Sequence, residues 1–388
     1  MAQAGGFGGR HRAGTQPLQL TMFELPTVPR KAEGKASEIL EHQRSHYIEM
    51  YDLAPRFVLY TPDKMRSGTR LEEIEREFQY RGNTYRLTME PARIYKKSRG
   101  SQDRTKLDLY PGEREQIVEE VVRRLALAGG RLTLSPGNMV RVTVSLREIY
   151  REMERIGRLT SFEDIREAID TLNKTHVTIQ NLDDNREKPL QFYPFLEVAY
   201  NKPKGQGWDE RSGTSIVLNS IVTAALRDLD FRQINYDQLM GLRDPIARWI
   251  YKRISLIPKE RPMVAMTASE IARDSGLANW SRWRDSVRRI TGAVHVLVRP
   301  GILESVEEQR EAEGNKLVDM TYIMNLSPSF VAEIRRSRRN MEANKRRLDR
   351  EFEESGNDDR RFIMKSPAET ELLRLANLAE MSEPVGPD

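Results

Sequence analysis

Arginine side chains gather on one side of a short amphipathic segment between about residues 280 and 294. At about 100° per residue in a helix, four apolar side chains of this segment form one narrow stripe: Trp283, Val287, Ile290 and Val294. The opposite side carries one serine and four arginines: Ser281, Arg282, Arg284, Arg288 and Arg289. Guanidinium groups form bidentate hydrogen bonds with guanine edges and with phosphates, so the pattern favours nucleic-acid binding. A solvated helix face gives the same pattern, and this segment alone does not separate the two interpretations.

The residues before this segment predict the element that positions it. Thr267 and Glu270 have the spacing of a capping box, which begins a short helix that Gly276 ends. A short helix, a tight turn and a longer helix with an arginine-rich outer side are typical of a helix-turn-helix. We therefore expect the helix 280–294 to enter the major groove, with arginine–guanine pairs for specificity and the other cations on phosphates.

Two strands follow the predicted helix-turn-helix. Residues 298–309 and 316–326 have strand-like patterns and are joined by a polar turn, as in the wing of a winged-helix domain. Arg310 and Lys316 flank the predicted turn and are expected to contact the DNA backbone.

The same pattern occurs once more, 122 residues earlier. A shift of that length superimposes the two capping boxes and the apolar positions of the long helices: Ser145 on Thr267, Glu148 on Glu270, Ile149 on Ile271, Ile165 on Val287 and Leu172 on Val294. Ser161 is the expected cap of the earlier long helix, and a strand pair over about residues 175–201 follows it. The sequence therefore predicts an α+β protein with two tandem winged-helix domains.

The outer sides of the two long helices differ in charge. The earlier helix carries three acidic residues, Glu163, Glu167 and Asp170, against Arg166 and Lys174. Phosphates repel such a surface. We expect the second domain to read the groove, and the first to contact the DNA backbone through Arg166 and Lys174 or to contact another subunit.

Composition divides the chain into four parts. Residues 1–74 are predicted to form a largely disordered arm, interrupted by a short apolar peptide at residues 19–23. Residues 75–210 and 211–330 are the two predicted winged-helix domains. Residues 331–388 are a charged helical tail, and its first part, 331–350, holds eight Lys and Arg against three Asp and Glu. Such a run is a solvated helix face or an extension of the phosphate contacts.

Bulk properties limit the class of protein. The 388 residues suffice for two or three domains, and 31% charged residues with a mean hydropathy of −0.65 are ordinary for a soluble globular protein. The net charge is +5 and there is no cysteine, which excludes disulfides, thiolate metal sites and a cysteine nucleophile. Neither a membrane-length apolar run nor a signal peptide is present, so a cytoplasmic location is expected.

Catalytic motifs are missing from the sequence. Gly34-Lys35 lacks the leading glycine and the Ser/Thr of a phosphate-binding loop, and the five histidines form no metal-ligand cluster. Tyr47 and Tyr51 have the spacing of paired tyrosines in some nicking enzymes, but the His-hydrophobe-His metal pair of those enzymes is absent. We expect a binding protein with no catalytic residues, metal or cofactor.

Taken together, these segments resemble the plasmid replication initiators of the TrfA type, in the wider class of iteron-binding Rep proteins. The resemblance covers roughly residues 75–330 and is carried by TSIVLNSIV, PIARWIYKRISL, SEIARDSG and SRWRDSVRRI in the second predicted domain, and by FQYRGNTYRLTM, VSLREIY and EDIREAIDTLN in the first. The peptide at residues 19–23 is similar to the Q-L-[SD]-L-F peptide that binds the bacterial sliding clamp. The resemblance implies that Gln19, Leu20, Met22 and Phe23 bind the clamp, although Thr21 and Met22 stand where the pattern has Ser or Asp and Leu.

The resemblance implies a bacterial, plasmid- or nucleoid-associated initiator. Such a protein binds direct repeats in double-stranded origin DNA and helps to open adjacent A·T-rich DNA, whose single strands it also binds. It recruits the sliding clamp, the replicative helicase and the host initiator. It also implies a monomer–dimer equilibrium with the dimer contact on the first domain. The alternatives are a winged-helix transcriptional regulator without a replication role and, less favoured, a nicking endonuclease.

Overall fold

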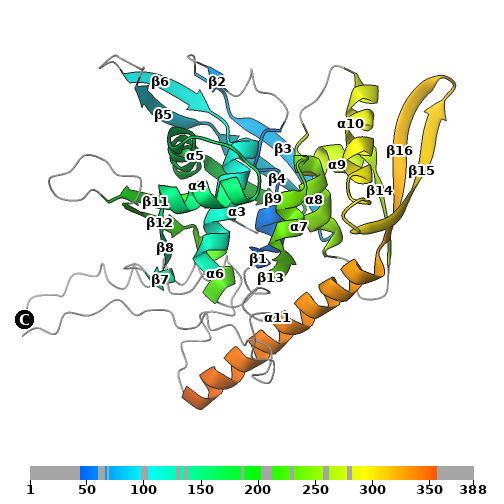
Figure 1. Cartoon of the computed structure of the whole chain (residues 1–388). Coiled ribbons are helices and arrows are strands. Elements are labelled where there is room, and N and C mark those ends of the chain that lie inside the picture. Colours follow the sequence, from blue (N-terminus) through cyan, green and yellow to red (C-terminus); the bar gives the residue numbers. More distant parts are fainter. Residues whose placement is uncertain are drawn as a thin grey trace, which may run out of the picture.

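Helices and strands alternate along the chain and give a mixed α and β structure (Figure 1). The computed structural model describes residues 44–59, 66–67, 70–97, 104–127, 132–134, 139–184, 188–201, 212–227, 231–256, 262–277 and 282–355. Within these ranges, no helix is both long and apolar enough to cross a membrane. The clamp-like peptide at residues 19–23 and Ser281 of the arginine-rich segment lie outside the described residues.

Part of the predicted N-terminal arm is packed into the body of the protein. Strand β1 (Arg44–Tyr47) pairs antiparallel with β13 (Arg232–Asn235), and helix α2 (Glu49–Leu53) follows it. Every residue from Tyr51 to Leu59 is buried. The prediction of a largely disordered arm to residue 74 is thus wrong for this stretch, because its aromatic and aliphatic side chains lack a regular period but still enter the core.

Three sheets hold most strands of the first half. Their strand orders are β10–β9–β4–β3, β11–β12–β8–β7 and β2–β6–β5. The strands are β2 (Arg66–Ser67), β3 (Ile74–Tyr80), β4 (Asn83–Glu90), β5 (Ala92–Lys97), β6 (Arg104–Leu109), β7 (Leu132–Leu134), β8 (Val140–Ser145), β9 (His176–Asn181), β10 (Leu190–Phe192), β11 (Phe195–Tyr200) and β12 (Gly213–Leu218). Strands β3 and β4 form a hairpin with its turn at Arg81 and Gly82, whose φ angles of 50° and 86° suit a tight hairpin.

Three helices pack on these sheets: α3 (Glu113–Leu127), α4 (Leu146–Arg155) and α5 (Phe162–Lys174). The predicted capping box begins α4, since the Ser145 side chain accepts from the Glu148 amide and the Glu148 carboxylate accepts from the Ser145 amide. Ser161 caps α5 as predicted. The apolar side of α5, including Ile165 and Leu172, is fully buried.

The second half contains helices α6 (Ser220–Arg227), α7 (Tyr236–Gly241), α8 (Pro245–Ile254), α9 (Ala268–Ser275) and α10 (Trp283–His295), with strands β14 (Met263–Thr267), β15 (Leu303–Glu313) and β16 (Lys316–Leu326). Thr267 and Glu270 form the predicted capping box of α9. Gly276 ends that helix with a φ of 73°, a left-handed conformation that glycine adopts at little cost. Asp244 caps α8 with Pro245 at its first position.

The strands of the two sequence copies pair differently. In the second copy β14, which precedes the capping box, pairs with β16 in a sheet of order β14–β16–β15. In the first copy the equivalent strand β8 pairs with β12 and β7, whereas the hairpin β9–β10 joins β4 in another sheet. The repeat in the sequence therefore extends to the helices and caps but not to the strand connections. Strand β12 lies just after residue 210, the expected domain boundary. It nevertheless pairs with β8 and β11, which both come before that boundary.

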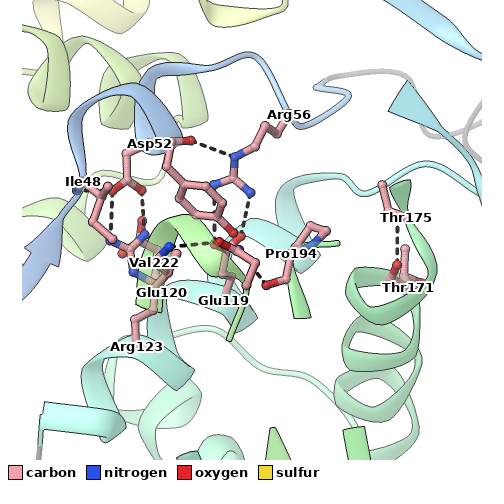
Figure 2. A network of polar contacts seen from close by, with 12 residues as sticks. Ile48, Asp52, Arg56, Glu119, Glu120, Arg123, Thr171, Thr175, Pro194 and Val222 are labelled. Atoms are coloured by element: carbon pink, nitrogen blue, oxygen red, sulfur yellow. Dashed lines mark hydrogen bonds and ion pairs between the residues drawn. The ribbon is translucent and has the colours of Figure 1, made fainter. Parts of the chain in front are cut away.

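A buried ionic network joins the N-terminal segment to both halves of the chain, and Figure 2 shows its part around Asp52, Arg56 and Arg123. The Asp52 carboxylate accepts hydrogen bonds of 2.7 and 2.9 Å from Arg123 of α3 and of 3.0 Å from Lys252 of α8. Lys252 also pairs with Glu120 of α3. Burial alone raises the pKa of Asp52, but the nearby Arg123 and Lys252 outweigh it and hold this pKa well below its ordinary value.

Two further contacts extend this junction. Arg56 pairs with Glu119 of α3 at 3.1 Å and covers the ring of Tyr51. The Trp249 indole of α8 donates 3.1 Å to the carbonyl of Leu53. Helix α8 is thereby fixed against α3 through the N-terminal segment, and α10 in turn packs on α8.

The last described element is helix α11 (Pro328–Ser355). It leaves the base of the β15–β16 hairpin and passes along the lower side of the molecule in Figure 1. Phe330 is buried against Tyr251, and the Ser337 hydroxyl donates 2.5 Å to the Gln233 carbonyl on β13.

Candidate nucleic-acid interface

Helix α10 is buried on one side and open on the other. The predicted apolar stripe faces the core: Val287, Ile290 and Val294 are 4%, 0% and 0% exposed, and Trp283 is half-buried against the same core. This stripe packs on α8, α9 and β16. The apolar stripe therefore belongs to the core, and the arginines lie on the remaining side of α10.

Arg284 and Arg288 lie on this open side. They are one helical turn apart, so they project from the same side of α10. Both are exposed, and the Arg288 side chain retains 78% of its accessible surface. Its contact with Asp285 at 3.6 Å is a loose surface pair that costs little to exchange for a phosphate or a base. Arg282, also exposed, occupies the N-cap position of α10.

Arg289 differs from the other three described arginines. Its guanidinium pairs with the Asp244 carboxylate at 3.0 Å, and 39% of its side chain is exposed. The other oxygen of Asp244 caps α8 through hydrogen bonds of 2.8 and 3.3 Å from the amides of Ile246 and Ala247. Arg289 therefore ties α10 to the N-terminus of α8. Residue spacing groups Arg289 with the other arginines of α10, but it does not reveal an acidic partner that is distant in the sequence.

A hollow of about 400 Å³ lies between α10 and the N-terminus of α8. Asp244, Asp285, Arg288, Arg289, Gly292 and Val296 line it. Charges of both signs meet in the hollow, and Gly292 leaves the backbone open there, so a polar edge of a partner could approach the helix closely.

The β15–β16 hairpin is longer than the sequence predicts. The predicted polar turn at 310–315 shrinks to Gly314 and Asn315, because Glu313 still pairs with Lys316. Arg310 consequently lies within β15 opposite Met320, and only Lys316 borders the turn. Both cations are exposed.

Strand register places Arg310 on the same face of the sheet as α10. Side chains opposite each other in an antiparallel pair share a face, and alternate residues follow. On this face Tyr322 reaches α10, where its hydroxyl lies 2.7 Å from that of Thr291, and Glu308 pairs with His295 at 2.6 Å. Burial raises the pKa of Tyr322 to about 12, so its hydroxyl stays protonated at neutral pH. Arg310, two residues beyond Glu308, extends the positive surface of α10 onto the hairpin.

Helix α5 of the first copy is enclosed on more sides than α10. It packs against α3, α4, β5 and β11. Glu167, predicted to lie on its acidic outer face, is only 7% exposed and pairs with Arg114 of α3 at 2.9 Å, so that prediction is wrong. Asp170 accepts 2.7 Å from the Tyr200 hydroxyl. These contacts leave less of the α5 surface open than of the α10 surface.

The two cations predicted on α5 are exposed but lie against aromatic rings. Arg166 covers the ring of Tyr200 at 4.7 Å, and the Lys174 ammonium lies 6.0 Å from the ring of Tyr95. They are on a different helix from Arg284 and Arg288, so their predicted role as backbone contacts is separate from groove reading. Among the residues described, no cluster of three or more His, Asp or Glu has metal-binding geometry.

Comparison with known proteins gives structural neighbours only. No family model and no curated protein matches the sequence. Two crystal structures of domains 2 and 3 of RctB are similar to this chain. The first is 13% identical, covers 71% of this chain and 96% of that one, and has a TM-score of 0.44. The second is 12% identical, with coverages of 73% and 98% and a TM-score of 0.41.

A third neighbour is the Pi initiator protein in complex with iteron DNA. It is 12% identical, over 55% of this chain and 93% of that chain, with a TM-score of 0.38.

Proposed function

We propose that residues 245–326 form a winged-helix module that reads duplex DNA through α10. The observation that carries the proposal is the pairing of a one-sided core with a one-sided charge: Val287, Ile290 and Val294 are buried while Arg284 and Arg288 are exposed on the same helix. The order α8, β14, α9, α10 and a hairpin is that of a winged helix, and the hairpin adds Arg310 to the α10 face.

The module belongs, in this proposal, to a plasmid replication initiator that binds direct repeats at its origin. The sequence resemblance to initiators of the TrfA type supports this over other winged-helix proteins. The first half of the chain then serves as a backbone-contacting or dimerising partner, in a tandem arrangement in which only the second copy enters the groove. The enclosure of α5 by β5 and β11 supports this division of roles. The protein acts by binding, without a catalytic step.

Footprinting on DNA that flanks the gene tests this function. Protection of several direct repeats, lost together in the double variant Arg284→Ala/Arg288→Ala, is the expected result. Protection of a single palindrome would identify a transcriptional regulator instead. An absence of any sequence-specific protection, with binding that is equal on random duplexes, would refute groove reading by α10. Nicking of supercoiled DNA in the presence of a divalent metal would refute the purely binding role.

Recruitment of host proteins is the second part of the proposal. The peptide Gln19–Phe23, similar to a clamp-binding motif, is proposed to engage the sliding clamp, and helicase and host-initiator contacts follow the same resemblance. Pull-down of purified sliding clamp with wild-type and Phe23→Ala protein measures the first contact. The variant is expected to retain far less clamp, and equal recovery would remove the clamp from the list of partners. Both proteins must bind DNA equally, which controls for folding.

A further inference from the structure

The sheet β14–β16–β15 has one face that points away from α10, and on it Asp319 accepts hydrogen bonds from the amide and the hydroxyl of Ser269 at the start of α9. Side chains alternate between the two faces of a strand, so this face carries the residues that alternate with those contacting α10. On β14 these include Met263 and Ala265, and Met263 is 55% exposed although it is apolar. On β15 they include Glu307 and Glu311, both exposed. Ile323 of β16, half-buried, lies between these two strands.

This outer face is predominantly acidic. Its β15 and β16 positions are Ser305, Glu307, Gln309, Glu311, Glu313, Lys316, Asp319, Thr321, Ile323 and Asn325. Four of these ten residues are carboxylates, and Lys316, at the hairpin turn, is the basic one. Strand β14 covers β16 only between Thr321 and Asn325, so the outer part of the hairpin is a two-stranded ribbon that projects from the body (Figure 1). An acidic surface repels phosphates, so a positively charged protein surface matches this face better than DNA does.

Helix α11 carries the complementary charge. Arg336, Arg339, Arg346 and Arg350 are exposed, and their spacing of three, seven and four residues places them in one row along the helix. The row spans fourteen residues, or about 21 Å at 1.5 Å per residue. The acidic face from Glu307 to the hairpin turn has a similar length, about 20 Å at 3.3 Å per residue. A small side chain, Ala343, is the exposed residue between Arg339 and Arg346.

The two surfaces cannot meet within one molecule as folded here. The tip of the hairpin and the C-terminal end of α11 lie at opposite corners of Figure 1, and points that are separated in a projection are at least that far apart in space. The charges can be matched only by another copy. We propose that the arginine row of α11 in one copy binds the acidic outer face of β14–β16–β15 in the next.

This contact, which rests on the proposed binding to direct repeats, explains why the two surfaces differ from each other. Copies bound to direct repeats all point the same way along the DNA, so neighbours touch through two unlike patches rather than one self-complementary patch. A head-to-tail contact of this kind links successive copies, and it leaves the α10 face of every copy on the DNA. The result is cooperative occupation of a repeat array.

Duplexes with one and with two copies of the footprinted repeat test the contact. Arg339→Glu/Arg346→Glu and Glu307→Arg/Glu311→Arg should each bind the single-repeat duplex like wild type. Each should lose cooperativity on two repeats by roughly tenfold, the size expected of several exposed ion pairs that act together. The chain with all four changes should recover cooperativity, because both charges are then exchanged. Arg147→Glu/Arg151→Glu on α4 is the matched control and should stay cooperative.

The opposite outcomes overturn the proposal. Weaker binding of Arg339→Glu/Arg346→Glu to the single-repeat duplex, without recovery in the fourfold variant, would show that the arginine row contacts DNA. Cooperativity that is unchanged in both double variants would also refute it. If wild-type protein does not bind the single-repeat duplex at all, the proposed function is refuted instead.

A cross-linking measurement reads the contact without a repeat sequence. The chain has no cysteine, so single cysteines are unique. Glu311→Cys protein mixed with Arg339→Cys protein should form a bis-maleimide-linked dimer, identified by mass, well above the level that either protein forms alone. Leu159→Cys, at a position 86% exposed on another part of the surface, replaces either partner as the control. Equal yields in all mixtures would refute a specific contact.

Discussion

The indole N–H of Trp283 donates a hydrogen bond of 2.9 Å to the backbone carbonyl of Val318. Trp283 begins α10 and Val318 lies in β16, beyond the part of the hairpin that β14 supports. One side chain therefore fixes the first turn of the helix, where Arg284 lies, to the projecting ribbon that carries Arg310. Together with the contacts of Tyr322 with Thr291 and of Glu308 with His295, this bond sets the relative placement of the two positive surfaces.

Replacing Trp283 by Ala should lower the free energy of unfolding by about 2–3 kcal/mol. A fully buried tryptophan costs about 3–5 kcal/mol on truncation, and Trp283 is only half-buried. Chemical denaturation monitored by circular dichroism gives the value. Trp283→Phe keeps the ring and removes only the N–H donor, so about 1 kcal/mol is expected for it. Unchanged stability of Trp283→Ala together with lost DNA binding would show that the residue contacts DNA.

Arg284→Ala and Arg288→Ala are expected to cost about 1–3 kcal/mol of binding free energy each on the specific repeat, if each reads a base through a bidentate pair. Titration of the specific repeat and of a random duplex of the same length, at one salt concentration, gives both affinities. Random duplex should be affected much less. Equal losses on the two duplexes would assign the residue to a phosphate. Arg151→Ala, on α4, is the matched control for the removal of one exposed arginine.

Arg289 should behave as part of the scaffold. Arg289→Ala is expected to destabilise the fold by about 0.5–1 kcal/mol, the range of a partly exposed ion pair, and to leave the ratio of specific to random binding unchanged. Asp244→Asn keeps an N-cap acceptor while it removes the charge, so it should cost a similar amount. The double variant should be no less stable than the worse single one, and a plain sum of the two effects would contradict the coupling.

Asp52→Asn should destabilise the protein by about 3–5 kcal/mol, because it leaves Arg123 and Lys252 buried without their shared anion. The depressed pKa of Asp52 has a further consequence. Its carboxylate contributes fully to stability above its ordinary value of 3.8, and the contribution is lost as the pH falls below that value toward the lower pKa of the folded state. Urea unfolding of both proteins from pH 7 to pH 3 measures this.

The difference in stability between wild type and Asp52→Asn should stay constant from pH 7 to about pH 5 and shrink only in more acidic buffer. A difference that grows on acidification would place the charge balance elsewhere. Lys252→Met, which removes a cation of similar length, is the companion variant. It should also destabilise the protein, because it takes the Lys252 ion pair away from buried Glu120 even though Arg123 still balances Asp52.

Short-range features of this chain could be predicted from the sequence. The capping boxes at Ser145 and Thr267, the left-handed Gly276 and the apolar stripe of α10 follow from residue types a few positions apart, and all are present. The core–surface division of α10 was therefore accessible without coordinates, and the exposed positions of Arg284 and Arg288 with it.

Features that depend on distant partners were not accessible. Glu167 looks like a surface residue until Arg114, from another helix, covers it. Arg289 fits the arginine pattern of α10, and only the fold brings Asp244 to it. The strand pairing of the first copy could not be predicted for the same reason. Strands β8 and β14 occupy equivalent positions in the sequence repeat but have different neighbours in their sheets. Register also extended the hairpin past the polar residues that the sequence marks as a turn.

The ionic junction at Asp52 also constrains the order in which the chain can mature. Its partners Arg123 and Lys252 come 71 and 200 residues later in the chain. During synthesis at about 5–20 residues per second, the segment around Asp52 therefore waits roughly 10–40 seconds for its second cation. Its aromatic residues stay uncovered for that time. The nascent N-terminal segment is therefore open to premature contacts until α8 has been translated.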